Sequence, residues 1–432
     1  MMRKRSKNKQ TRRRKGGRVI ASGSYGCVFH PALRCHSKKT RSKNKITKLM
    51  TRKDANDEYE LSQKILRRVK HIKNYKNYFM VDNFSLCAPG KLSKKDLEEY
   101  DERCNALTRE NITTQNINDS DSLDKILALN MPNGGVSIDK YLREYHSDDD
   151  CIELNNKLID LLVNGIVKMN ANHIYHCDLK YDNILVERDN NSETVHTRLI
   201  DWGLSTEYVP FKHNDFMSAW GDRPILFNQP FSVILFSDKF KTLYKEYIKS
   251  GKKVEQEALK PFVLDYLRLV IRTHGSRQLG YVQKIMYMLF IPANEKSFFT
   301  SYDKGKNQSQ QKKVDEEITT PYIVNYIVQV LLKFTKLKED GTIDLRFYLD
   351  NLFIKIVDIY GFLLSYIVIY EMIQKKQHTY GTYMKKEMKI LNFIKALFIK
   401  YLFEPCVKEI NLDELVENLR ELNHLLESPD TN

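Results

Sequence analysis

The sequence predicts an α+β protein of two lobes: a small lobe of antiparallel strands with one helix, and a larger, mainly helical lobe. Two observations lead to this prediction. Residues 18–50 read as strands with an interrupting basic loop, and an amphipathic helix pattern follows them. Beyond residue 203, long apolar helical patterns succeed one another. A length of 432 residues with 42% hydrophobic content is enough to form a buried hydrophobic core in a protein of two lobes.

The first lobe is predicted over residues 18–131. Its strands are expected in "RVIASGSYGCVFHP" and "NKITKLM", and a helix in residues 54–70, where apolar residues recur at helical spacing. Residues 90–122 are polar and weakly patterned, so they are interpreted as an excursion before the strand "DKILALNM". This order, strands then one helix then a further strand, gives the small lobe its antiparallel sheet.

The second lobe is predicted over residues 132–432. A short helix near 137–145 and a long one at 152–172 precede the segment "HIYHCDLKYDNILV", and a hairpin joins "NILVE" to "VHTRLID". The remaining helices are expected near 257–272, 279–291, 319–336, 344–375, 385–403 and 412–427.

Basic residues are concentrated at the start of the chain. The formal net charge is +15, and residues 1–18 contain ten Lys or Arg and no acid, which leaves about +5 for the rest. Residues 1–17 are therefore predicted to be a disordered basic tail. Such a tail is typical of chains that bind acidic or nucleic-acid-rich surfaces or carry a nuclear address; a solvated tail with only non-specific electrostatic roles is the alternative.

Cysteine usage and hydropathy limit the cellular compartments in which the protein is expected. Seven cysteines, an odd number without a CxxC pair, predict reduced thiols and an intracellular, cytoplasmic protein, with a nuclear location possible through the basic N-terminus. The longest apolar run, residues 359–370, is too short to cross a bilayer and is flanked by Asp358 and Glu371. It is interpreted as a buried core helix, and no membrane insertion is expected.

Two features of the first lobe are suited to a polyphosphate. In "ASGSYGCV", Gly23 and Gly26 lie between two strands, where missing side chains let backbone N–H groups approach phosphate oxygens; a plain hairpin is the alternative. Lys48 stands opposite to its apolar neighbours in a strand. On the next helix Glu58 shares the core-facing side with Leu61, whereas Glu60 points away, so Glu58 is the predicted partner of Lys48.

The second lobe supplies the polar residues that phosphoryl transfer requires. Asp178, Lys180 and Asn183 stand at offsets 0, 2 and 5 within an apolar frame, and Asp201 follows the next strand in "LIDWGLS". Asp178 can accept a proton from an incoming hydroxyl, and Lys180 can neutralise a transferring phosphoryl group. Asn183 and Asp201 offer oxygen ligands to magnesium. Turn and cap roles for these residues are the structural alternative.

In this order the motifs resemble those of protein kinases, and Lys180, two places after Asp178, is similar to the serine/threonine class. The resemblance implies a bilobal kinase fold, ATP and Mg²⁺ as cofactors, and proteins with Ser or Thr hydroxyls as substrates. It also implies that "VDIYGFLLSYIVIYEMI" is the buried central helix whose Asp358 anchors the catalytic loop. The residues it assigns to the nucleotide are Ile20, Gly23, Ser24, Tyr25, Gly26, Val28, Lys48, Glu58 and Met131.

A narrower resemblance and several departures complete the picture. "GSYGCVFHPALRC" and "RPILFNQPFS" resemble kinases encoded by giant nucleocytoplasmic large DNA viruses, which implies a host cytoplasm or a virion. Cys177 replaces the arginine that precedes the family's catalytic aspartate, so activity is expected without activation-loop phosphorylation. Residues 204–350 lack an Ala-Pro-Glu motif and are interpreted as an insertion. A catalytically weak pseudokinase scaffold and a small-molecule or lipid kinase are the alternative functions.

Overall fold

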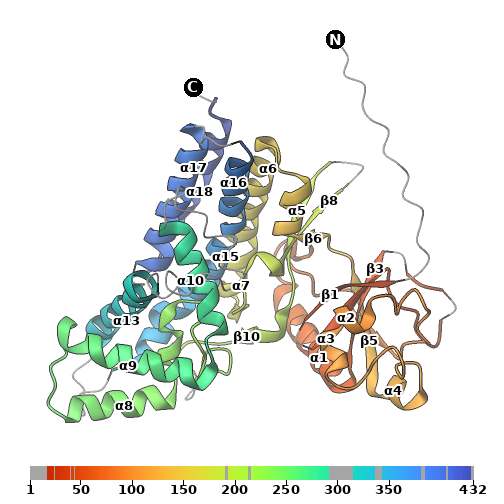
Figure 1. The fold of residues 1–432 in the computed structure, drawn as a ribbon, viewed down its shortest axis with the longest axis horizontal. Coiled ribbons are helices and arrows are strands. Elements are labelled where there is room, and N and C mark those ends of the chain that lie inside the picture. The colour runs from red at the N-terminus through yellow and green to blue at the C-terminus, as the bar shows by residue number, and fades with distance from the viewer. Residues whose placement is uncertain are drawn as a thin grey trace. The chain divides into compact units, whose positions relative to one another are not determined.

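The chain is an α+β protein that divides into two compact units (Figure 1). This computed structural model describes residues 17–23, 25–38, 40–42, 44–189, 193–212, 216–290, 315–335, 343–380, 385–404 and 407–429. The smaller unit contains the chain up to Arg67 and Met80–Gly134; the larger contains Arg68–Phe79 and everything from Gly135 onward. Apart from Gly17, the predicted basic tail lies outside the described residues.

The smaller unit is built on a five-stranded antiparallel sheet. Its order is β1-β2-β3-β5-β4, so the last strand in the sequence is inserted beside β3. Helix α1 begins directly after β3 at Arg52 and ends at Val69. The strands are β1 (Arg18–Ser22), β2 (Gly26–His30), β3 (Lys45–Thr51), β4 (Ser85–Cys87) and β5 (Ile126–Pro132).

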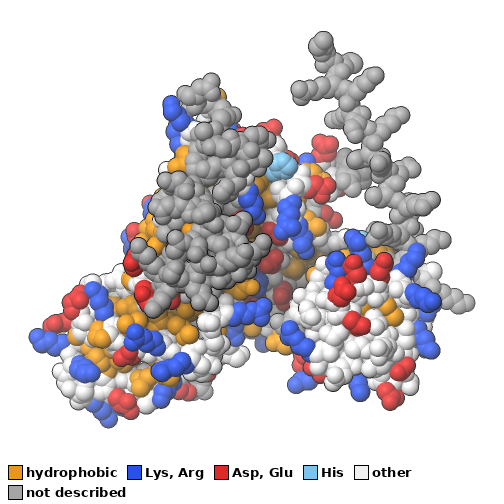
Figure 2. Space-filling view, viewed as in Figure 1, with side chains coloured by type: hydrophobic (Ala, Val, Ile, Leu, Met, Phe, Trp, Pro, Cys, Tyr) orange, Lys and Arg blue, Asp and Glu red, His pale blue; other side chains and the backbone are white. Residues whose placement is uncertain are grey.

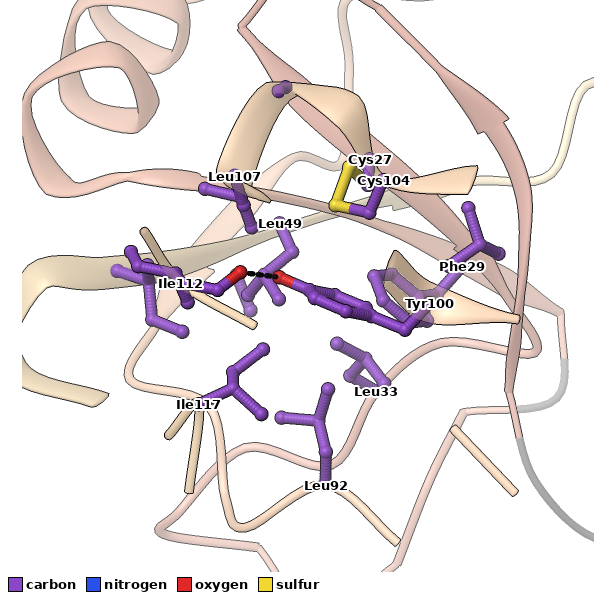
Figure 3. Close-up of a cluster of buried hydrophobic side chains, with 14 residues drawn as sticks. Cys27, Phe29, Leu33, Leu49, Leu92, Tyr100, Cys104, Leu107, Ile112 and Ile117 are labelled. Atoms are coloured by element: carbon purple, nitrogen blue, oxygen red, sulfur yellow. Dashed lines mark hydrogen bonds between the residues drawn. A yellow bond between two sulfur atoms is a disulfide. The ribbon is translucent and has the colours of Figure 1, made fainter. Parts of the chain in front are cut away.

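Residues 93–125 pack onto one face of this sheet, which corrects their interpretation as a weakly patterned excursion. They form α2 (Tyr100–Arg103), α3 (Asn105–Thr108) and α4 (Ser120–Lys125). Their apolar side chains join those of the strands in one buried cluster (Figure 3). The Tyr100 hydroxyl lies inside this cluster and donates a hydrogen bond of 3.2 Å to the Ile112 carbonyl oxygen. The sequence signal was weak because these helices are only one or two turns long.

Two disulfides lie in the smaller unit, so the prediction of reduced thiols is wrong for four cysteines. Cys27 of β2 pairs with Cys104, which lies between α2 and α3, and Cys35 pairs with Cys87 of β4. The partners are 77 and 52 residues apart, and their Cα atoms lie 5.4 and 5.7 Å apart, within the usual range for a disulfide. Pairing is set by this proximity in space, which cysteine spacing does not show. Cys151 and Cys177 are free and buried.

The buried carboxylate of Asp96 binds Gly17, the first described residue of the smaller unit. The side chain of Asp96 is fully buried and accepts hydrogen bonds from the Gly17 N–H at 2.8 Å and from both Arg41 terminal nitrogens. Ser93 donates its N–H and its hydroxyl, each at 2.7 Å. Burial alone would raise the pKa of Asp96, but the hydrogen bonds from Arg41 and Ser93 hold this pKa below its usual value.

The larger unit combines small antiparallel sheets with long helices. Helix α6 (Asp148–Asp160) continues through a π-helical turn into α7 (Val167–Ala171), which accounts for the single long helix predicted there. The hairpin is confirmed as β8 (Ile184–Arg188) and β9 (Val195–Leu199). The other strands and the helix that precedes α6 are β6 (Val136–Ser137), β7 (Ile174–Tyr175), β10 (Thr206–Glu207) and α5 (Ile138–Glu144).

Residues beyond 230 supply most of the helices of the larger unit. Helix α8 (Asp238–Lys249) was not predicted, and the others follow the expected order. They are α9 (Gln256–His274), α10 (Arg277–Phe290), α13 (Thr320–Phe334), α14 (Leu345–Tyr348), α15 (Ile354–Leu364), α16 (Ile367–Tyr380), α17 (Lys385–Phe398) and α18 (Leu412–Glu427). On the face drawn in Figure 2, basic and acidic side chains are interspersed over α8 and α9.

The stretch Leu345–Lys375 forms the apolar centre of the larger unit. By length and composition it could cross a membrane, and 94% of its most apolar window is buried inside the unit. All residues of α15 except Lys355 are buried, including its one carboxylate, Asp358. Helix α15 therefore presents buried surface on every side, and its polar group must find partners inside the protein.

We expect Asp96→Asn to reduce the free energy of unfolding of the smaller unit by about 2–3 kcal/mol at pH 7, because it leaves Arg41 without its charged partner. The folded pKa of Asp96 lies below that of the unfolded chain, so this contribution is present above about pH 4 and is lost as the pH falls through the folded value. Urea unfolding at several pH values measures both effects. The exposed Glu98→Gln is the matched control, and an equal loss in both variants would contradict the assignment.

Candidate active site

The glycine turn of the smaller unit is closed by its own backbone. The Gly23 N–H donates to the Gly26 carbonyl oxygen at 2.9 Å. A Cβ added at Gly26 would lie 2.7 Å from the Leu49 carbonyl oxygen and 2.5 Å from Met50 Cγ, so only glycine allows β2 to approach β3 here. Ser24 lies outside the described residues.

Lys48 pairs with Glu58, the acid that the helical spacing selects over Glu60. Lys48 Nζ lies 2.5 Å from Glu58 Oε2, and the two side chains are 14% and 19% exposed. Glu60, on the same helix, is exposed. At this depth the pair is only partly screened by water, so Glu58 restrains the position of the lysine ammonium.

The sheet register places the predicted nucleotide residues on one face. Val28 is opposite Lys48, and Ile46 is opposite Met131, so the side chains of Val28, Lys48 and Met131 share a face. Cys27 and Leu49 alternate with them and lie in the buried cluster on the other face. Two further predicted residues are exposed: Ile20 at 41% and Tyr25 at 63%.

In the larger unit, Asp358 fixes the backbone of the Asp178 loop, residues 173–183. Its Oδ2 accepts the His176 N–H at 2.9 Å and the Asn170 side-chain amide at 2.7 Å, and its Oδ1 accepts the Cys177 N–H at 2.9 Å. These contacts agree with the anchoring role that the resemblance implies for Asp358. The loop also lies directly on α15, because Gly361 has no side chain: a Cβ there would be 2.4 Å from the Leu179 carbonyl oxygen.

The Asp178 carboxylate is held by donors on both oxygens. Lys180 Nζ and Asn183 Nδ2 donate to Oδ2 at 2.7 and 3.0 Å. Asn228 Nδ2 donates to Oδ1 at 2.8 Å. The structure thus brings together Asp178, Lys180 and Asn183, the three residues predicted from their spacing, and adds Asn228. A cation and two amides thus restrain the position of the carboxylate.

Asp201 follows β9 at a position that the Asp178 loop holds in place. The preceding Ile200 donates its N–H to the Asn183 carbonyl oxygen at 3.0 Å, and its own carbonyl lies 2.9 Å from His176 Nε2. Asp201 itself has a left-handed backbone with φ of 62° and an exposed side chain. Trp202 is buried, with its ring centre 4.9 Å from that of His176. The exposed carboxylate therefore projects from a fixed backbone.

The side-chain atoms that can bind a cation are oxygens. Asn183 uses Nδ2 on the carbonyl and carboxylate of Asp178, so Oδ1 is the atom of this side chain that could bind a cation. Asp201 offers a second, charged oxygen donor. One or two protein oxygens, with the rest of the shell supplied by phosphates and water, is the set that Mg²⁺ prefers. The donor set therefore fits magnesium.

Cys177, next to Asp178, is unsuited to nucleophilic chemistry. Burial, and then the charge of Asp358, raise the pKa of its thiol well above the usual value. The thiol therefore stays protonated at neutral pH, and Cys177 is not a candidate for the group that removes a proton from a substrate.

Sequence reasoning missed Asn228 and its neighbour Gln229. Asn228 also donates to the Leu179 carbonyl oxygen at 3.1 Å, and Gln229 donates to that of Cys177. Both lie in the stretch "RPILFNQPFS", where two consecutive amide side chains between apolar residues were the available signal. Because neither residue lies in a helix or strand, the sequence could not show where the two side chains point.

Comparison with known proteins assigns no family, since no protein-family model and no curated protein matches the chain. The site therefore has to be interpreted from its own chemistry.

We expect Gly361→Ala to destabilise the larger unit by about 1–3 kcal/mol, because the new methyl group meets the backbone of Leu179 and of Asn228 rather than a movable side chain. Gly280→Ala in α10 is the matched control. A Cβ there has no described atom within 4 Å, so the helix should gain up to about 1 kcal/mol. Urea unfolding monitored by circular dichroism measures the free energy of unfolding of both variants. Similar changes in the two variants would contradict the close approach at Gly361.

Proposed function

We propose that this chain is an ATP- and Mg²⁺-dependent serine/threonine protein kinase with the bilobal fold of that family. The observation that carries the proposal is the restraint on the Asp178 carboxylate, which accepts hydrogen bonds from three side chains. Asp358 in addition binds the backbone N–H of the preceding residue, Cys177. A carboxylate restrained in this way, beside a lysine and an oxygen donor for magnesium, suits proton removal from an acceptor hydroxyl.

Each residue has one role in the proposed reaction. Asp178 orients the hydroxyl of a Ser or Thr and receives its proton. Lys180 keeps its ammonium at the carboxylate and faces the charge that develops on the transferred group. ATP with magnesium supplies the phosphoryl group and offsets its negative charge. Asn183 Oδ1 and Asp201 would hold the metal ion.

The smaller unit would bind the nucleotide. In the turn containing Gly23 and Gly26, backbone N–H groups other than that of Gly23, which bonds to the Gly26 carbonyl oxygen, would approach phosphate oxygens. Lys48, restrained by Glu58, offers a cation. Val28 and Met131, on the same face as Lys48, supply the apolar surface that an adenine ring requires. The substrates would be proteins with exposed Ser or Thr, and the basic tail would favour acidic or nucleic-acid-rich surfaces.

Transfer of labelled γ-phosphate from ATP tests the proposal. With magnesium, the wild type should label Ser or Thr of a protein acceptor, and Asp178→Asn should lower kcat by about 10²- to 10⁴-fold because the amide cannot take the proton. Its binding of ATP should be retained. Nucleotide binding without transfer would contradict the proposal in favour of a scaffold, and label only on lipid or small molecules would contradict the substrate class.

The pair of glutamates on α1 gives a second, matched test. Glu58→Gln should lower kcat/KM for ATP roughly 10- to 100-fold, because Lys48 loses the charge that restrains it. Glu60→Gln changes the same functional group two residues away on the exposed side and should leave kcat/KM within about twofold. Equal effects in the labelled-transfer assay would show that the Lys48–Glu58 pair has no part in nucleotide use.

A further inference from the structure

Two consecutive amide side chains, Asn228 and Gln229, are buried without belonging to a helix or strand. They are 2% and 1% exposed and lie just before the short 3₁₀ helix Phe231–Leu235. Burying an amide is costly unless hydrogen bonds replace those to water. Their partners therefore indicate why amides stand at these two positions.

The partners are three successive residues of the Asp178 loop. Gln229 Nε2 donates to the Cys177 carbonyl oxygen. Asn228 Nδ2 donates to Asp178 Oδ1 at 2.8 Å and to the Leu179 carbonyl oxygen at 3.1 Å. The two amides thus bracket Asp178: one holds the carbonyl before it, and the other holds its carboxylate and the carbonyl after it.

Asn228 is itself fixed from the other side. Its backbone carbonyl oxygen would lie 3.0 Å from a Cβ placed at Gly361, so this stretch lies against the same glycine of α15 as the Leu179 backbone does. The Asp178 loop and Asn228, whose side chain contacts the Asp178 carboxylate, therefore both pack against α15. The amide is held in place before any substrate arrives, so it restrains Asp178 without an ordering cost during the reaction.

The donors divide between the two oxygens of the carboxylate. Lys180 and Asn183, from the same loop, both donate to Oδ2. Asn228 donates to Oδ1 from a segment about fifty positions further along the chain. With its Oδ1 donor removed, the carboxylate would keep the two donors at Oδ2 and could turn about its Cβ–Cγ bond.

We propose that Asn228 is a positioning residue of the kinase reaction, which fixes the orientation of the Asp178 carboxylate. The inference rests on the proposed function. It has a kinetic consequence: a carboxylate that can turn spends less time in the orientation that accepts the proton of the hydroxyl. Loss of the Asn228 donor should therefore lower kcat and leave the binding of ATP unchanged.

The experiment measures kcat and KM of labelled phosphate transfer for the full chain. Asn228→Ala should lower kcat roughly 10- to 100-fold, and KM for ATP should stay within about twofold. Asn228→Asp keeps the shape but replaces the donor by an acceptor that repels Asp178 Oδ1, and should lower kcat at least as much as Asn228→Ala does. Asn228→Ser retains a donor and should recover part of kcat.

Gln229→Met is the control, because it removes the neighbouring amide and its bond to Cys177 without touching the carboxylate. Its kcat should fall less than that of Asn228→Ala even if its melting temperature falls further. An unchanged kcat in Asn228→Ala, an equal loss in Gln229→Met, no recovery in Asn228→Ser, or activity losses that simply follow the melting temperatures would each overturn the proposal. If Asn228→Asp does not fold, the kcat values of Asn228→Ala and Asn228→Ser test the proposal. A wild type that transfers no phosphate overturns the proposed function itself, a result distinct from those above.

Discussion

The local structure of the Asp178 loop depends on the carboxylate of Asp358. It is 1% exposed, and removing such a group from water costs several kcal/mol. Three hydrogen bonds from His176, Cys177 and Asn170 offset this cost. Because two of the donors are successive backbone amides, the carboxylate fixes the direction in which the chain enters residue 178. The geometry of the carboxylate, of Lys180 and of Asn183 follows from that direction.

Helix α15 combines this anchor with a close approach. Asp358 and Gly361 are three residues apart and therefore lie on the same side of the helix. One position binds the loop by charge, and the other makes room for its backbone. Ile200 and Asp201 are then held through Asn183 and His176 rather than through the helix itself. These contacts thus form one connected network, which links the carboxylate of α15 to the backbone that precedes Asp201.

Periodic and local features were predictable from the sequence. Helical spacing selected Glu58 over Glu60, strand alternation placed Lys48 away from its apolar neighbours, and the span of α18 was predicted to the residue. The spacing of Asp178, Lys180 and Asn183 also predicted that they meet. Each of these depends on separations of a few residues or on one regular element, where geometry follows directly from position in the chain.

Features that join distant segments were not predictable in this way. The Cys27–Cys104 and Cys35–Cys87 pairs and the contact of Asn228 with Asp178 all link segments about fifty or more residues apart. Nothing in the local pattern of either partner identifies the other. The prediction of reduced thiols from the odd number of cysteines was wrong for the same reason. A count of cysteines does not show which thiols lie close together in the folded chain.

The covering of the sheet in the smaller unit changes how its surface can be used and how it tolerates mutation. Tyr100, Leu107 and Ile117 turn what would be an open sheet face into interior (Figure 3). A binding protein selected against this unit would meet the outsides of α2 and α3 on that side and not the strands. In a mutational scan, polar substitutions at these three positions would appear as losses of folded protein. Intolerance of this segment to mutation would therefore reflect packing and not recognition.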